Sequence, residues 1–123
     1  MSLQEWSENI VLAELHDDPG FTDDMTALLE HIEKHPHLDV ACNFSDVNYL
    51  NSSNLAKLLR LRKLVTITNQ RRLVLCAVNT HVWGLFLTTG LNKTFDFADG
   101  VAVGLAQLQI GRADKSPEDH ANN

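Results

Sequence analysis

The sequence predicts a single α/β domain in which a small, mixed but mainly parallel β-sheet is flanked by about four helices. Short apolar runs of strand length alternate with longer runs whose apolar residues recur at helical spacing. The run LVLCAV at 73–78 contains no polar residue, as expected of a central parallel strand covered on both faces. A chain of 123 residues is also long enough to bury one sizeable core.

The first half of the chain predicts two strands and one helix. Residues 9–15 form a short β-type run, which ends at the turn sequence Asp-Pro-Gly. Apolar residues then recur on one face from 21 to 32, and Asp23 and Asp24 suit the start of a helix. His35 and Pro36 are expected to end this helix, and residues 39–50 to form a second strand and its exit.

The second half continues the alternation. A helix is expected from Ser52 to about Thr68, and the strand at 73–78 leads into a helix that Asn79 or Thr80 caps and Gly90 ends. KTFDFAD then predicts a short strand, and GVAVGLAQLQI a final helix weakened by two glycines. We therefore expect an N-terminal extension at 1–8, the domain at 9–110 and a disordered tail without apolar periodicity at 111–123.

Composition argues against several classes of function. The net charge of −6 disfavours nucleic-acid binding, which needs clustered Lys and Arg. No run approaches the roughly 20 apolar residues of a membrane span, and the N-terminus lacks the apolar core of a signal peptide. We therefore expect a cytoplasmic protein with neither nucleic acid nor membrane as partner. Cys42 and Cys76 are interpreted as buried free thiols, with a disulfide or a reactive thiol as the alternative.

Enzyme and metal motifs are not found in the sequence. It has no G-x-S-x-G, no phosphate-cradling Gly-rich loop and no metalloprotease motif, so we expect neither an enzyme nor a cofactor. His31, His35 and His37 are spaced like metal ligands, but Pro36 interrupts the geometry and no Cys or carboxylate completes the set. We interpret them as helix-end histidines and predict no metal site, with a small metal-dependent or ligand-binding enzyme as the alternative.

The candidate site lies in YLNSSNLAKLL at 49–59, where Asn51-Ser52-Ser53-Asn54 joins a strand to a helix. Asn and Ser are good N-cap residues, worth about 1 kcal/mol over Ala, so capping alone explains the motif. The junction after a strand's carboxyl end is also where functional residues collect in α/β sheets. By contrast, we interpret the adjacent pairs Asp17–Asp18 and Asp23–Asp24 as turn and cap residues.

Two segments resemble the STAS domain family of anti-sigma factor antagonists. DVNYLNSSNLAKLL (46–59) resembles the family segment apolar-x-x-Asp-Ser-Ser-Gly-Leu-x-x-Leu-Leu. LVLCAVNTHVWGLFLTTGLNKTFDFADGVAVGLAQL (73–108) resembles its closing half, an apolar strand, a helix ending Leu-Phe-x-x-(Ser/Thr)-Gly-Leu, a short strand and a last helix. The residues that match this helix ending are Leu85, Phe86, Thr89, Gly90 and Leu91. The resemblance covers about 9–110 and implies a small sheet flanked by helices.

The resemblance implies a regulator that is the substrate of a kinase. The family's best-understood members bind a kinase-like anti-sigma factor, which phosphorylates the first serine of the Asp-Ser-Ser-Gly motif. Only the unphosphorylated form captures the anti-sigma factor and frees the sigma factor. Carried over by position, the phosphate acceptor is Ser52, with Ser53 as the second choice. A phosphate at a helix N-terminus is tolerated, so we expect the switch to act in the interface and leave the fold intact.

A rival hypothesis follows from two departures from the family motif. Asn51 replaces its Asp and Asn54 replaces its Gly, which favours a STAS scaffold or interaction module that has lost the switch. In either case we expect the partner to meet the sheet edge where the parallel strands end. The expected partner-binding residues are Asn48, Tyr49, Asn51, Ser53, Asn54, Asn79 and Thr80. The sequence leaves open which sigma pathway is involved and whether the domain forms a homodimer.

Overall fold

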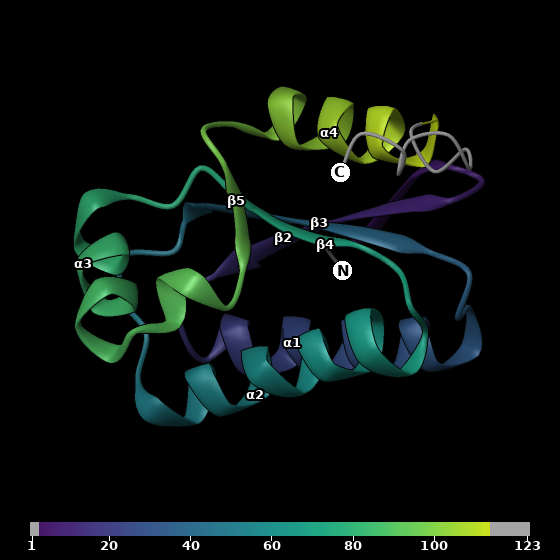
Figure 1. Ribbon diagram of the computed structural model, residues 1–123. Coiled ribbons are helices and arrows are strands. Elements are labelled where there is room, and N and C mark those ends of the chain that lie inside the picture. Colours follow the sequence, from purple (N-terminus) through teal and green to yellow (C-terminus); the bar gives the residue numbers. More distant parts are fainter. Residues whose placement is uncertain (1–2, 114–123) are drawn as a thin grey trace.

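The computed structural model describes the backbone of residues 3–113 and the side chains of residues 3–110. It contains a five-stranded sheet with the strand order β1-β2-β3-β4-β5 (Figure 1). β1 (Leu3–Ser7) pairs antiparallel with β2 (Ile10–His16). β3 (Asp39–Asp46), β4 (Leu73–Cys76) and β5 (Asp96–Ala98) then follow β2 in parallel. The predicted mixed, mainly parallel sheet is confirmed.

Helices cover both faces of this sheet and one of its ends. α1 (Gly20–Lys34) and α2 (Ser52–Arg62) lie side by side on one face, and α4 (Val101–Ala113) lies on the other (Figure 1). α3 (Thr80–Thr89) sits at the end of the sheet. The predicted helix from Ser52 to Thr68 is present, but its last part, η1 (Lys63–Thr68), is a π-helix. A short 3₁₀ turn, η2 (Leu91–Lys93), follows α3.

The core consists of two apolar layers, one on each face of the sheet. Because side chains alternate along a strand, Val11 and Ala13 face α1 and α2, whereas Ile10 and Leu12 face α4. β4 is buried along its whole length, as the run LVLCAV predicted. The larger layer, under α1 and α2, is filled by Phe21, Met25, Leu28, Ile32, Phe44, Leu58, Leu61, Val65 and Phe86 among others. This core fixes the strand ends from which the candidate site is built.

The two cysteines are free and buried, as predicted. Cys42 belongs to the layer under α1 and α2, and Cys76 to the layer under α4. They lie on neighbouring strands but are one residue out of register, so their side chains point to opposite faces of the sheet. Burial raises the pKa of both thiols, that of Cys76 to about 11. Neither thiol is therefore a reactive nucleophile at neutral pH.

The chain ends differ from the predicted boundaries. Residues 3–7, which we expected to belong to an N-terminal extension, form the edge strand β1 of the same sheet. Its sequence LQEWS gives little signal, because backbone pairing with β2 holds the strand while most of its side chains are exposed. At the other end α4 continues to Ala113, three residues past the predicted domain boundary. Residues 114–123, most of the tail expected to be disordered, lie outside the described residues.

Candidate functional site

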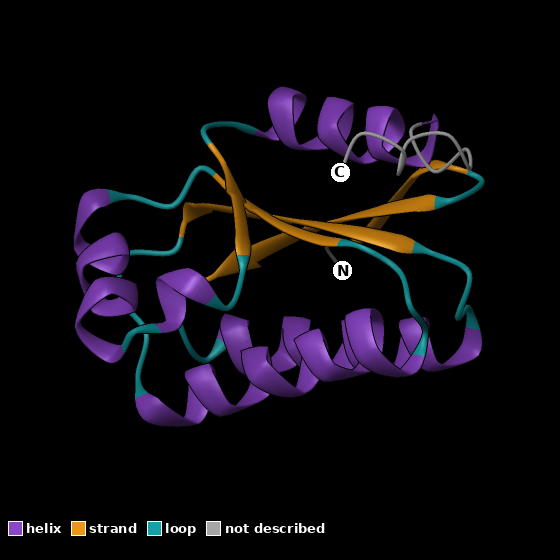
Figure 2. Cartoon of the chain, viewed as in Figure 1, coloured by secondary structure: helices purple, strands orange, loops and turns teal. Residues whose placement is uncertain are grey.

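The loops that leave β2, β3 and β4 meet at one edge of the sheet, beside α3 (Figure 2). This follows from the parallel arrangement, since parallel strands end at the same edge. A hydrogen bond joins the β3–α2 and β4–α3 loops: the Asn79 side-chain amide donates to the carbonyl oxygen of Val47 at 2.8 Å. The structure therefore brings the predicted residues on the β3–α2 and β4–α3 loops together.

The first turn of α2 is capped by Asn51. Its Oδ1 accepts a hydrogen bond of 2.8 Å from the backbone N–H of Asn54. In return, Oδ1 of Asn54 accepts one of 3.0 Å from the backbone N–H of Asn51, which completes a capping box. From the sequence alone, any residue of the motif could have been the cap. In the structure the two asparagines cap the helix. Neither serine is needed as the N-cap.

The two serines differ in their surroundings. Both are exposed in the first turn of α2. The Ser53 hydroxyl accepts a hydrogen bond of 2.9 Å from the ammonium group of Lys57, one turn further along the helix. The Ser52 hydroxyl has no hydrogen-bond partner among the residues that the structure describes. Ser52 thus offers a free hydroxyl to solvent at a helix N-terminus.

Asp18 connects the candidate loop to the start of α1. Its Oδ2 accepts hydrogen bonds from the side-chain amides of Asn54, at 2.9 Å, and Asn51, at 3.3 Å. Its Oδ1 accepts from the backbone N–H of Thr22 at 2.9 Å and from the Thr22 hydroxyl at 2.8 Å. These bonds, that from Asn54 foremost, lower the pKa of Asp18. The carboxylate therefore stabilises the start of both helices at once.

Asp17 holds the other end of the same loop. Its Oδ1 accepts from the backbone N–H of Asn48 at 2.8 Å and of Tyr49 at 3.4 Å, and its Oδ2 accepts from the Asn48 amide at 2.8 Å. Desolvation opposes ionisation here, but the bonds from Asn48 outweigh it and lower the pKa of Asp17. From the sequence we interpreted Asp17 and Asp18 as turn residues, and this role was not predicted. Their position directly after a parallel strand was the signal.

The predicted partner-binding residues are not equally accessible. The exposed ones are Asn48, Tyr49, Asn51, Ser53 and Thr80, and Tyr49, a large aromatic residue, is 47% exposed. Asn79 is partly buried and caps α3, where its Oδ1 accepts from the backbone N–H of Val82 at 2.9 Å.

Asn54 differs from the other predicted residues in being only 1% exposed. The Asp18 carboxylate draws its side chain inward, so we remove Asn54 from the partner-facing surface. Its backbone is helical, so the position does not require the conformational freedom of a glycine.

The histidines at the end of α1 pack against one another. The rings of His31 and His35 lie 4.4 Å apart, and Nδ1 of His35 lies 2.9 Å from the His31 carbonyl oxygen. Nε2 of His31 lies 3.5 Å from a carboxylate oxygen of Glu5 on β1. Within residues 3–110, no three His, Cys, Asp or Glu side chains have the arrangement of a metal site.

Several solved structures share this arrangement of strands and helices, two of them with at least 84% of this chain and 90% of the other chain covered. One is an anti-sigma factor antagonist (STAS) domain protein from Planctomyces limnophilus, with a TM-score of 0.74 and 13% identity over 89% of this chain and 99% of that one. The chain has the STAS fold. The other is a Thermotoga maritima protein proposed to be an anti-sigma factor antagonist, with a TM-score of 0.66 and 12% identity over 84% of this chain and 90% of that one.

The STAS fold is recognisable here from structure more than from sequence. No model of a protein family matches the chain, and no curated protein sequence matches it. In the described part of the chain, no helix combines the length and the apolar character needed to cross a membrane. The fold predicted from the two sequence segments is thus confirmed, and the function has to be argued from the site.

Proposed function

We propose that this STAS protein is an anti-sigma factor antagonist of the cytoplasm that binds a kinase-type anti-sigma factor and is switched off by phosphorylation of Ser52. The observation that carries the proposal is the division of roles in Asn51-Ser52-Ser53-Asn54. The asparagines form the capping box, Ser53 is bonded to Lys57, and Ser52 alone of the four keeps a free, exposed side chain. A hydroxyl in this position is open to a kinase.

The electrostatics of the site support a switch that acts on binding. Phosphorylation adds about −1.5 to −2 charges, and a helix N-terminus accommodates an anion. The added charge joins the carboxylates of Asp17 and Asp18, which already border the loop. A partner that approaches this edge through acidic or backbone carbonyl groups is then repelled. Because a like-charge contact in an interface costs several kcal/mol, one phosphate is enough to abolish binding.

The replacement of the family's Asp by Asn51 does not remove the negative charge from the motif. Oδ2 of Asp18 lies 3.3 Å from the Asn51 amide, so a carboxylate supplied by the β2–α1 loop borders the same residue. This supports the switch over the rival hypothesis of a scaffold without one. The scaffold hypothesis is favoured in turn by the tight hydrogen bonding of both asparagines, which makes the loop rigid.

The proposal is tested by capture and phosphorylation. Wild-type protein, Ser52→Asp and Ser53→Asp are used as parallel baits in a lysate of the native host, and the captured proteins are identified by mass spectrometry. We expect an anti-sigma factor with a kinase domain to bind wild type and Ser53→Asp and to be lost with Ser52→Asp. Incubated with ATP, the captured kinase should add one phosphate to wild type and none to Ser52→Ala. Equal capture by all three baits would instead support the scaffold.

A further inference from the structure

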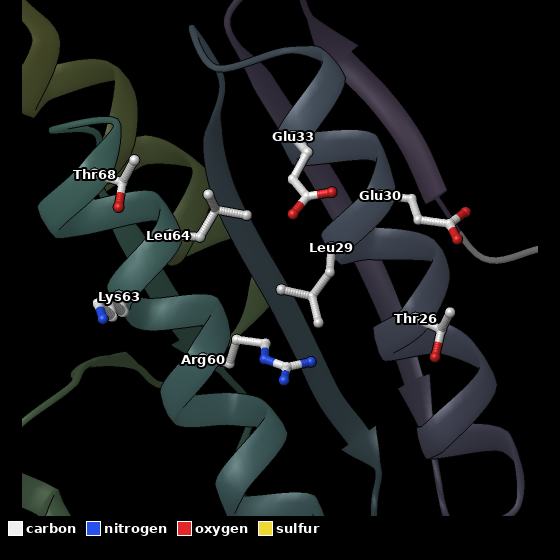
Figure 3. A pocket seen from close by; sticks show the side chains of 8 residues that line it. All are labelled: Thr26, Leu29, Glu30, Glu33, Arg60, Lys63, Leu64 and Thr68. Atoms are coloured by element: carbon white, nitrogen blue, oxygen red, sulfur yellow. The ribbon is translucent and has the colours of Figure 1, made fainter.

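The face formed by α1 and α2–η1 carries a groove that the proposed switch does not use. The hollow has a volume of about 420 Å³. Leu29 on α1 and Leu64 on η1 point into it from opposite sides, and Arg60 extends across it toward α1 (Figure 3). Its other lining residues are Thr26, Glu30, Glu33, Lys63 and Thr68. The groove thus has an apolar floor and charged walls.

The two walls carry opposite charges. Glu30 and Glu33 stand on α1, and Arg60 and Lys63 stand on α2–η1, with the same spacing of three residues on each wall. In Figure 3, Glu33 and Arg60 lean toward the groove, whereas Glu30 and Lys63 lie on its outer rims. None of the four is used in an ion pair within residues 3–110, so all four remain available to a partner.

The arrangement is complementary to itself. Both helices return from parallel strands, so they run in the same direction along the groove. Consider a two-fold axis that lies along the groove, parallel to the two helices. Rotation about it leaves the direction of the helices unchanged and places α1 of one protomer opposite α2–η1 of the other. The acidic wall of one protomer then meets the basic wall of the other, twice over, and the leucines meet near the axis. Exposed apolar residues on α2–η1, Leu59 and Ile67, lie within one turn of Lys63 and extend the contact.

We infer that this groove is a homodimer interface, in which Glu30 and Glu33 of one copy face Arg60 and Lys63 of a second copy. The occupant is another molecule of the same chain because a groove with one acidic and one basic wall matches its own rotated image. The inference does not rest on the proposed phosphorylation, since the Ser52 end of α2 lies outside the groove.

The face is small for a stable dimer interface. α1 has 15 residues, so its length is about 22 Å, and two helices side by side are about 20 Å wide. That gives roughly 450 Å² per protomer, against roughly 800 Å² per partner in a standard stable interface. We therefore expect a weak dimer, with a Kd on the order of 100 µM at low salt, that dissociates as ionic strength rises.

Sedimentation velocity of the full chain over about 10 µM to 1 mM tests the inference. Glu30→Lys with Glu33→Lys makes both walls basic, and Arg60→Glu with Lys63→Glu makes both walls acidic. Each double variant should associate at least about tenfold more weakly than wild type, because like charges then face each other at both walls. An equimolar mixture of the two variants should dimerise again, since one supplies only basic and the other only acidic walls.

The matched control for Glu30→Lys with Glu33→Lys makes the same change of two acids to two lysines away from the groove. Glu8→Lys with Asp99→Lys alters two exposed acidic residues on the β1–β2 turn and after β5, and should dimerise like wild type. Circular dichroism confirms that each variant is folded. The inference would be overturned by any of three results: wild type stays monomeric at 1 mM, both charge-reversed variants dimerise as strongly as wild type, or the mixture of the two variants stays monomeric.

Discussion

At the scale of single residues, the candidate site depends on a set of amide and carboxylate side chains from two loops. Asn51 and Asn54 exchange side chain to backbone hydrogen bonds, and Asp18 accepts from both amides. The segment and both asparagines were predicted from the sequence, but four neighbouring residues that can all cap a helix gave no basis for assigning a role to each. The deciding contacts come from Asp17 and Asp18, which lie more than 30 residues away in the chain.

We predict that Asn54→Ala destabilises the protein by about 1–3 kcal/mol. It removes half of the capping box, empties the buried site of the Asn54 amide and takes from the Asp18 carboxylate its shorter amide hydrogen bond. Urea unfolding followed by circular dichroism measures the change. Ser52→Ala is the control and should stay within about 0.5 kcal/mol of wild type, because the Ser52 hydroxyl holds nothing in place. A neutral Asn54→Ala would show that the capping box is not the anchor of this loop.

Asp17 and Asp18 make stability depend on acid pH. Hydrogen bonds lower the pKa of both carboxyl groups in the folded state. At Asp17 desolvation acts in the opposite direction, and the hydrogen bonds outweigh it. A depressed folded-state pKa adds stability above the unfolded pKa of about 3.9, and that stability is lost as pH falls through the folded value. We therefore predict that stability falls more steeply below about pH 4 in wild type than in Asp18→Asn. Parallel curves for the two proteins, from urea unfolding at each pH, would contradict this account.

At the scale of elements, the sequence predicted those whose apolar residues are regularly spaced. The helices α1, α2 and α3 and the strand β4 have such patterns, and all were found close to their predicted bounds. β1 was missed because hydrogen bonding to β2 forms it without a buried face. The π-helix η1 that continues α2 was not predicted, because the spacing of the leucines and valines is compatible with either an α-helix or a π-helix.

The two glycines of the predicted final helix, Gly100 just before α4 and Gly104 within it, have different surroundings. A Cβ at Gly104 would clash with the Cys76 sulfur, so this glycine lets the helix lie close to the sheet, whereas Gly100 has open space around it. We predict that Gly104→Ala costs about 1–3 kcal/mol through overpacking. Gly84→Ala in α3 is the matched control, because nothing lies near its added methyl group, and it should gain about 0.4–1 kcal/mol. Thermal unfolding of the two variants beside wild type measures both; similar shifts in the two would refute close packing at Gly104.

At the scale of the whole molecule, the candidate switch and the inferred dimer surface occupy different places. Ser52 lies at the sheet edge beside α3, and the groove runs along the outer face of α1 and α2–η1 (Figures 1 and 3). A partner bound at the edge therefore leaves the groove uncovered. We expect phosphorylation to change partner binding while the tendency to dimerise stays the same.

We propose that a phosphate on Ser52 abolishes partner binding without disturbing the fold. The most direct measurement is calorimetric titration of the captured anti-sigma factor with unmodified and fully Ser52-phosphorylated protein, alongside urea unfolding of both forms. We expect phosphorylation to lower the affinity at least about a hundredfold, which is about 2.7 kcal/mol, and to change the free energy of unfolding by no more than about 1 kcal/mol. Equal affinities, or a loss of affinity that accompanies unfolding, would contradict it.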